Sequence, residues 1–355
     1  MLSHIDGFDS EGMKQLEIYA PRLDFFQTEL GIKLIKDTFE RKLAKKLCLL
    51  RVSAPRFLMV GTGLQDDLAG TQKPVSFKSR FSEKEIEIVH SLAKWKRYAL
   101  GKYGFRLGTG LYTDMDAIRK DEDVDETHSI YVDQWDWEKV ISKEDRTIHF
   151  LKKIVRSIYS AIIETESAVV KRFPALKIRL PKKIEFVHAE ELEKYYPSLT
   201  PKEREDAITK KHGAVFIIGI GHPLKSGKPH DIRAADYDDW STLTDKKQGL
   251  RGLDGDIMIW DSIRQKALEI SSMGIRVDKD ALLLQLGMMG LIHRKELVFH
   301  KGVIDGSTPL SIGGGIGQSR LCMLFLQKTH IGEVQSSVWP SKTEEELSEQ
   351  GVTLL

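Results

Sequence analysis

Four strand-like runs in the second half of the chain limit its possible folds more than any other feature. These runs are rich in β-branched and aliphatic residues and cover residues 184–189, 214–221, 256–261 and 266–277. Loops and irregular segments separate them, whereas a doubly wound parallel sheet requires regular crossover helices between its strands. The pattern therefore predicts an α+β fold, in which helices flank a largely antiparallel β-sheet.

The helices expected around this sheet have clear amphipathic or capping patterns. Apolar residues recur with helical spacing along residues 30–47 and 147–172, so each segment is predicted to form a long helix with one buried face. A shorter helix is expected after Thr200, which can cap it together with Glu203. This helix should end at Gly213.

Composition excludes several classes of protein. No linker, repeat or low-complexity segment is found, so residues 21–355 are expected to form one catalytic domain after an N-terminal extension, residues 1–20, that is flexible or loosely docked. Lys and Arg total 54 and Asp and Glu 52, so no overall charge attracts the chain to nucleic acid or an anionic membrane. The absence of a long apolar run predicts a cytoplasmic protein without a membrane partner.

The stretch SIGGGIGQSRLCMLF, residues 311–325, is a candidate nucleotide-binding element. We interpret it as a glycine-rich loop that opens a buried helix, but it matches neither common phosphate-binding fingerprint. Gln318 stands where the dinucleotide fingerprint requires a glycine, and no Gly-Lys-Ser/Thr follows, as a P-loop requires. The glycines alone are compatible with a tight turn. Arg320, however, leads the apolar run and needs a carboxylate, a phosphate or a ring face as its partner.

A second cluster of polar residues lies on a strand predicted at residues 128–138. Alternation places Gln134 and Asp136 on one face and two tryptophans on the other. Such a pattern is typical of an edge strand with a solvated face, but an amide and a carboxylate at this spacing can also grip an ammonium group. Upstream, Arg119 ends an apolar segment, and its guanidinium is a candidate for clamping a phosphate.

A third cluster joins the last two strand-like runs. Asp256 and Glu269 are a plausible pair of oxygen ligands for Mg²⁺ held jointly with the phosphates of a nucleotide, although two acids on adjacent strands more often form a solvated face. Strict alternation places Glu269 and Arg276 on opposite faces. If both serve one site, a β-bulge is expected near Gly274.

Together these segments resemble the three signature motifs of class II aminoacyl-tRNA synthetases, in the aspartate/asparagine/lysine subgroup. The segment that ends in Ser-Ala-Pro resembles motif 1, RKDED with HSIYVDQWDWE resembles motif 2, and GGGIGQSRLCMLF resembles motif 3. A closer resemblance is to the ammonia-dependent asparagine synthetases, or aspartate–ammonia ligases, which share this fold. The resembling segments are residues 60–70, 89–97, 110–123, 128–138, 230–242, 269–278 and 311–321.

This resemblance implies a ligase that forms a carbon–nitrogen bond. The family converts L-aspartate, ATP and ammonia into L-asparagine, AMP and pyrophosphate through a β-aspartyl-adenylate, with ATP and Mg²⁺ as cofactors. The likeness to motif 1 implies a homodimer. No tRNA or DNA partner is expected, because the chain has neither an additional domain nor a basic block that would bind nucleic acid.

The resemblance also implies roles for individual residues. Arg119 is expected to neutralise the α-phosphate, Arg320 to hold the adenine and the far phosphates, and Asp238 to accept a proton from ammonium, a role that Asp66 would otherwise serve. The expected aspartate ligands are Asp66, Lys96, Gln134, Asp136 and Arg276. The expected ATP or AMP ligands are Arg119, Asp256, Glu269, Ser272 and Arg320, with Mg²⁺ between Asp256 and Glu269.

Free ammonia is the expected nitrogen donor, because a glutamine-hydrolysing enzyme needs an activated nucleophile, commonly a cysteine after the initiator methionine. Leu2 stands there, and Cys48 and Cys322 lie in apolar contexts typical of inert buried thiols. Two alternatives remain open at this point. One is an aspartyl- or asparaginyl-tRNA synthetase, and the other is an inactive synthetase paralogue that acts as a regulatory subunit.

Overall fold

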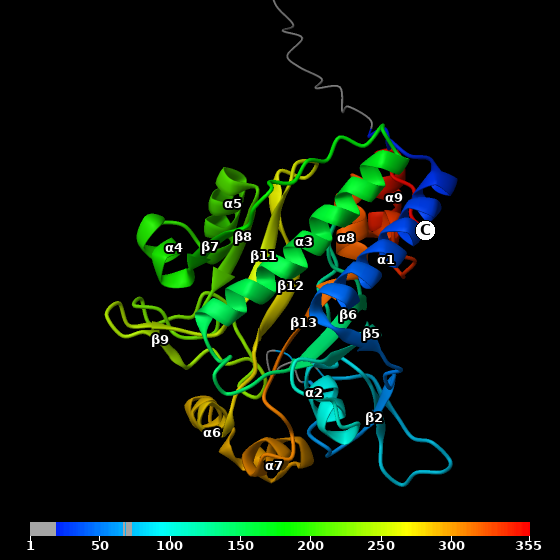
Figure 1. Cartoon of the computed structure of the whole chain (residues 1–355). Coiled ribbons are helices and arrows are strands. Elements are labelled where there is room, and N and C mark those ends of the chain that lie inside the picture. The colour runs from blue at the N-terminus through cyan, green and yellow to red at the C-terminus, as the bar shows by residue number, and fades with distance from the viewer. Residues whose placement is uncertain (1–18, 67, 69–72) are drawn as a thin grey trace, which may run out of the picture.

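The computed structural model describes residues 19–66, 68 and 73–355. Within them, the main sheet has eight strands in the order β1-β5-β6-β13-β12-β11-β8-β7 (Figure 1). Their bounds are β1 (Leu49–Arg51), β5 (Gly110–Ile118), β6 (Tyr131–Val140), β13 (Ser311–Gly317), β12 (Lys266–Ile275), β11 (Asp254–Asp261), β8 (Ala214–Ile218) and β7 (Glu185–His188). Only the outer pairs, β1 with β5 and β7 with β8, are parallel. The predicted α+β fold with a largely antiparallel sheet is therefore confirmed.

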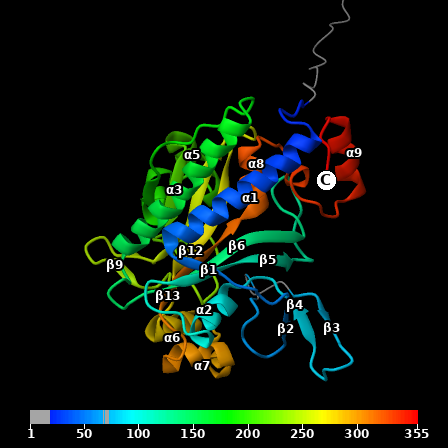
Figure 2. The same ribbon diagram turned by 45° about the vertical axis from the view of Figure 1, so that its right-hand side comes forward.

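Two long helices, α1 (Phe25–Leu47) and α3 (Ile148–Arg172), run side by side across one face of the sheet (Figures 1 and 2). The shorter α8 (Gln318–Phe325) lies on the same face. The main core fills the space between these helices and the sheet, and in it the rings of Phe39 and Trp135 pack with centroids 4.7 Å apart. Both tryptophans of β6 belong to this core, so the polar residues that alternate with them face the opposite side.

Local capping explains where several helices begin and end. Asp24 and Gln27 form a capping box at the start of α1, and Thr147 caps α3. In α5 (Pro201–His212), Thr200 accepts a hydrogen bond from the backbone of Glu203, and Gly213 ends the helix with φ of 78°. The three helices predicted from the sequence are thus confirmed.

The remaining elements surround the main sheet. A small sheet of β2 (Phe57–Met59), β4 (Ile86–Ile88) and β3 (Ser76–Phe77) lies near α2 (Ala93–Lys102) at one end of the molecule (Figure 2). The others are α4 (Ala189–Tyr195), β9 (Leu243–Asp245), β10 (Leu250–Arg251), α6 (Lys279–Met288), η1 (Ile292–Glu296), α7 (Val298–Asp305), η2 (Ile331–Glu333) and α9 (Ser341–Glu349).

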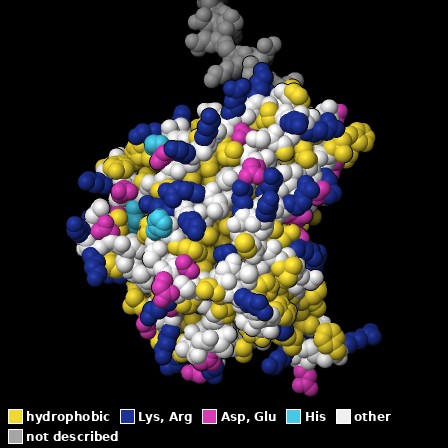
Figure 3. All heavy atoms as spheres, in the orientation of Figure 1, with side chains coloured by type: hydrophobic (Ala, Val, Ile, Leu, Met, Phe, Trp, Pro, Cys, Tyr) yellow, Lys and Arg dark blue, Asp and Glu magenta, His cyan; other side chains and the backbone are white. Residues whose placement is uncertain are grey.

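The surface over α1 and α3 carries many Lys and Arg side chains interspersed with Asp and Glu (Figure 3). Among the helices in the described ranges, none combines the length and the apolar character needed to cross a membrane.

The glycine-rich stretch is a strand, and its interpretation as a loop was wrong. Ser311–Gly317 forms β13, which is hydrogen-bonded to β12 on one side and β6 on the other. Glycine here makes room for side chains of β6. A Cβ at Gly313 would lie 1.8 Å from Glu138 Oε2, and one at Gly315 would lie 2.1 Å from Gln134 Oε1. The predicted buried helix with Arg320 in its first turn does follow, as α8.

The predicted β-bulge exists, but its position near Gly274 was wrong. Ile257 pairs with Ser271 and Met258 with Glu269, so Ile270 is the extra residue of β12. The bulge reverses the alternation between Glu269 and Ser272. As a result, both residues line the same cavity as Arg276.

One alternative left open for residues 128–138 is excluded, and one sequence interpretation is corrected. The strand β6 is not an edge strand, because it pairs with β5 and β13. Cys322 is buried as expected, but Cys48 is exposed; it ends α1 in the left-handed conformation with φ of 59°. The predicted extension, residues 1–20, lies almost entirely outside the described residues.

Candidate active site

A cavity of about 290 Å³ opens on the polar face of β6, opposite α1 and α3. It brings together side chains from β6, β12, α2, α8 and the segment before β9. All predicted site residues except Asp256 line it, namely Asp66, Lys96, Arg119, Gln134, Asp136, Asp238, Glu269, Ser272, Arg276 and Arg320. Neither cysteine does.

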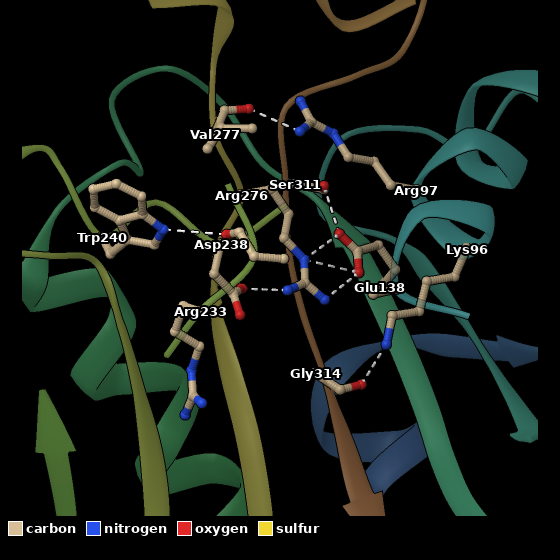
Figure 4. Close-up of polar contacts among 12 residues, drawn as sticks. Lys96, Arg97, Glu138, Arg233, Asp238, Trp240, Arg276, Val277, Ser311 and Gly314 are labelled. Atoms are coloured by element: carbon tan, nitrogen blue, oxygen red, sulfur yellow. Dashed lines mark hydrogen bonds and ion pairs between the residues drawn. The ribbon is translucent and has the colours of Figure 1, made fainter. Parts of the chain in front are cut away.

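One part of the cavity presents a buried lysine and carboxylate. Lys96 donates to Asp136 Oδ1 at 3.0 Å. It also donates to the carbonyl oxygen of Gly314 at 2.7 Å (Figure 4). Burial lowers the pKa of Lys96, and the charge of Asp136 opposes this effect. The second oxygen, Asp136 Oδ2, is buried without a hydrogen-bond partner in the described structure. It is therefore available to a donor group of a ligand.

Arg276 is held between two carboxylates. Its Nε and Nη2 donate to Glu138 at 3.0 and 2.9 Å, and its Nη1 donates to Asp238 (Figure 4). Ser311 Oγ also donates to Glu138, at 2.7 Å. Although burial acts to lower it, Glu138 and Asp238 raise the pKa of Arg276 above its ordinary value. The network fixes the guanidinium in the cavity wall.

The other part of the cavity presents two arginines. Arg119 follows β5 and lies 3.7 Å from Glu122, and its Nε is buried without a partner among the described residues. Arg320 donates to the carbonyl oxygen of Glu269 at 3.1 Å and lies 3.7 Å from its carboxylate. Arg320 thus has the carboxylate partner that the sequence argument allowed. The two guanidiniums form a region suited to phosphate groups.

The acidic pair predicted to hold Mg²⁺ is divided between two environments. Glu269 faces the cavity, and Arg320 and Arg233 keep its pKa below the ordinary value although burial acts to raise it. Asp256 lies outside the cavity lining, and both its oxygens accept hydrogen bonds from Arg233 Nη2, at 2.6 Å for Oδ1. In the described ranges no group of three or more His, Cys, Asp or Glu side chains forms a possible metal site.

Sequence reasoning assigned no role to two important residues. Glu138 shares the face of β6 with Gln134 and Asp136, so alternation could have identified it. Arg233 lies in the irregular segment before β9, within the resembling segment 230–242. No periodic pattern marked it, and its partner Asp256 is distant in the sequence and meets it only in the fold.

The fold and cavity define a class of protein with the catalytic-core fold of class II aminoacyl-tRNA synthetases. One solved relative is asparaginyl-tRNA synthetase of Pyrococcus horikoshii complexed with asparaginyl-adenylate, with a TM-score of 0.65, 14% identity and coverage of 88% of this chain and 70% of that one. Another is asparaginyl-tRNA synthetase of Entamoeba histolytica, with a TM-score of 0.62, 16% identity and coverage of 88% and 67%. At this identity the likeness concerns the fold alone.

Sequence comparison identifies the family. The aspartate–ammonia ligase of Parabacteroides distasonis is 53% identical over 338 residues, which cover 95% of this chain and 97% of that protein. The aspartate–ammonia ligase of Bacteroides thetaiotaomicron is 52% identical with the same coverage. The family model for aspartate–ammonia ligase matches residues 26–351. The chain therefore belongs to the aspartate–ammonia ligase family, as its resemblance indicated.

Proposed function

We propose that this protein is an aspartate–ammonia ligase that makes L-asparagine from L-aspartate and ammonia. ATP is converted to AMP and pyrophosphate through a β-aspartyl-adenylate. The observation that carries the proposal is one cavity that joins a phosphate-binding region, Arg119 and Arg320, to a region suited to a small amino acid, Lys96 and Asp136. Family membership supports the same reaction.

The first half-reaction joins two anions. The side-chain carboxylate of aspartate attacks the α-phosphorus of ATP, so the site must position both groups in line and neutralise their charge. Arg119 would hold the α-phosphate, Arg320 the adenine and the far phosphates, and Ser272 a ribose hydroxyl. All three line the cavity, which supports this arrangement.

The charges of the side chains that line the cavity indicate which residues would bind aspartate. The α-ammonium group would bind to the unpartnered Asp136 Oδ2, with Gln134 and Asp66 beside it. Lys96 and Arg276 would face the substrate carboxylates with the N–H groups that the protein does not use. Because Arg276 is already fixed by Glu138 and Asp238, it would bind aspartate with little loss of side-chain freedom.

Mg²⁺ fits this site as an ion held mainly by the nucleotide. Mg²⁺ commonly takes one or two carboxylates together with phosphate oxygens and water, so a full protein cage is not required. Glu269 would be its ligand at the cavity, and Asp256 would join only after release from Arg233. When bound, Mg²⁺ would offset the charge of the pyrophosphate leaving group.

The second half-reaction requires ammonia as a neutral nucleophile. Its lone pair attacks the β-carbonyl carbon, the bond to AMP breaks, and a proton must leave the new amide. Asp238 is our candidate acceptor for a proton, with Asp66 as the alternative, and both line the cavity.

We further propose that the enzyme is a cytoplasmic homodimer that acts without tRNA. Exposed apolar side chains near the outer strand β1 and the small sheet support an interface there, with Leu50 at 63% and Phe57 at 53% exposure. This is the region that resembles motif 1.

Two assays test the function. Aspartate-dependent exchange between ATP and pyrophosphate detects adenylate formation, and asparagine formation from ammonium without tRNA detects the complete reaction. Absence of exchange would favour an inactive paralogue. Exchange with transfer only to tRNA would favour an aminoacyl-tRNA synthetase.

A further inference from the structure

Arg233 lines the main cavity together with Arg119 and Arg320, and Asp256 holds its guanidinium. Its Nη2 donates to both oxygens of this carboxylate, at 2.6 Å for Oδ1. Nη1 makes only a long hydrogen bond, of 3.4 Å, to the carbonyl oxygen of Ile232, and within the described ranges Nε is buried without a partner. The side chain therefore has one strong partner and keeps N–H groups for a further acceptor.

The same guanidinium stands beside both carboxylates proposed for Mg²⁺. In the ladder between β11 and β12, Asp256 lies opposite Ser272, which lines the main cavity together with Glu269. The two carboxylates therefore lie on one face of the sheet. Burial acts to lower the pKa of Arg233, but Asp256 and Glu269 are among the charges that raise it above its ordinary value. Any cation that binds this acidic pair must compete with a charged arginine.

This competition is costly unless a second anion enters the cavity. The side chains of Arg233 and Asp256 are only 12% and 8% exposed. Removing one partner of such a buried ion pair costs about 3–5 kcal/mol, because the other charge stays uncompensated. A metal ion alone would satisfy Asp256 but would leave Arg233 without its carboxylate. A nucleotide supplies phosphate oxygens, which a guanidinium binds as well as it binds a carboxylate.

We propose that Arg233 is a further phosphate-binding residue, which Asp256 holds until Mg²⁺ and ATP bind together. The inference deepens the proposed ligase function and rests on it. Asp256 exchanges Arg233 for the metal, and Arg233 exchanges Asp256 for a phosphate group, so no buried charge is left alone. By linkage, each of the two ligands then raises the affinity for the other. The acidic pair should bind a divalent cation weakly when nucleotide is absent.

The first test measures binding of Mn²⁺ without nucleotide. Mn²⁺ takes the same oxygen ligands as Mg²⁺, and its paramagnetic resonance distinguishes free from bound ion. Arg233→Met removes the competing cation, so we expect it to bind Mn²⁺ at least about tenfold more tightly than wild type does. A pH of about 8 keeps proton competition for the carboxylates weak.

The matched control for this test is Arg264→Met. Arg264 Nε donates to Asp261 at 3.0 Å in a buried pair at the other end of β11, and neither residue lines the main cavity. Loss of this arginine leaves an aspartate without its partner, but not beside Glu269. Its affinity for Mn²⁺ should stay within about twofold of wild type, because one isolated carboxylate binds the ion poorly.

The second test measures binding of ATP by calorimetry in the presence of a chelator that removes all metal. Asp256→Asn releases Arg233 without Mg²⁺, so we expect this variant to bind metal-free ATP at least about fivefold more tightly than wild type. Adding Arg233→Met should return the affinity to within about twofold of wild type, since the released guanidinium is then absent. Asp261→Asn is the control, because it frees Arg264 away from the cavity.

Either test can overturn the proposal. Equal affinity of wild type and Arg233→Met for Mn²⁺ would exclude the competition, and no gain in metal-free ATP binding by Asp256→Asn would exclude the phosphate role. Arg233→Lys serves if Arg233→Met does not fold. Lysine keeps a charge beside Asp256 but lacks the planar fork, so Mn²⁺ should still bind about threefold more tightly or better, and an unchanged affinity would count against the proposal.

Failure of the ligase function would be recognised separately. Both binding measurements need no turnover, whereas a protein without ligase activity would show no aspartate-dependent exchange between ATP and pyrophosphate in the wild type.

Discussion

Replacing Glu138 by Gln should reveal how much the buried network contributes to stability. Glu138 is fully buried and accepts hydrogen bonds from Arg276 and Ser311. Breaking a buried ion pair costs about 3–5 kcal/mol, and Gln retains one neutral hydrogen bond worth about 1 kcal/mol. Since Asp238 still pairs with Arg276, we expect Glu138→Gln to lower the free energy of unfolding by about 2–4 kcal/mol.

The same substitution should affect the binding of aspartate more than that of ATP. Arg276 lines the cavity and depends on Glu138 for the orientation of its Nε and Nη2. A guanidinium that moves more freely must be ordered when aspartate binds. We therefore expect KM for aspartate in the exchange reaction to rise about tenfold, which corresponds to about 1.4 kcal/mol, while KM for ATP stays nearly constant.

Urea unfolding followed by circular dichroism measures the first effect, and initial rates of exchange measure the second. Glu126→Gln is a suitable control, because Glu126 forms an exposed pair with Lys266 at 3.0 Å and should change stability by less than about 0.5 kcal/mol. If Glu138→Gln lowers stability no more than this control and leaves KM for aspartate unchanged, the network does not position Arg276.

Three other predictions concern the fold. Gly313→Ala places a Cβ 1.8 Å from Glu138 and should destabilise the protein by about 3 kcal/mol or more, whereas Gly287→Ala, in an open position on α6, should stabilise it by about 0.5–1 kcal/mol in the same urea assay. Burial lowers the pKa of His188, whose ring accepts a hydrogen bond from the first turn of α4, so the folded state binds this proton less readily than the unfolded chain. Stability should therefore decrease as the pH falls through and below the ordinary histidine pKa, and urea midpoints at about pH 7.5 and 5.5 should differ more in wild type than in His188→Asn. A thiol reagent should label Cys48 in the native protein and Cys322 only after unfolding, because burial raises the pKa of Cys322 to about 12, and rapid native labelling of both would contradict the buried position of α8.

Sequence reasoning was successful where the determining interactions are local. The start of α5 depends on Thr200 and Glu203, which are three residues apart, and the faces of β6 follow from simple alternation. It was less successful where distant segments meet. The bulge at Ile270 depends on how β12 pairs with β11, and the partner of Asp256 is Arg233, which comes from an irregular segment. Neither feature has a periodic pattern that a single segment could reveal.

The glycine-rich strand β13 depends both on local preferences and on contacts between distant segments. Glycine has a low intrinsic preference for strands, so a run of glycines before a helix resembles a loop when only local preferences are considered. In the fold, Gly313, Gly315 and Gly317 lie opposite Glu138, Asp136 and Gln134 of β6. Side chains at the glycine positions would occupy the space of those polar groups, as the contacts at Gly313 and Gly315 show directly. The glycines of β13 have a low preference for strands, but they leave the space in which β6 holds a row of polar side chains at the centre of the sheet. This exchange explains why the candidate site lies on a rigid strand and not only on loops.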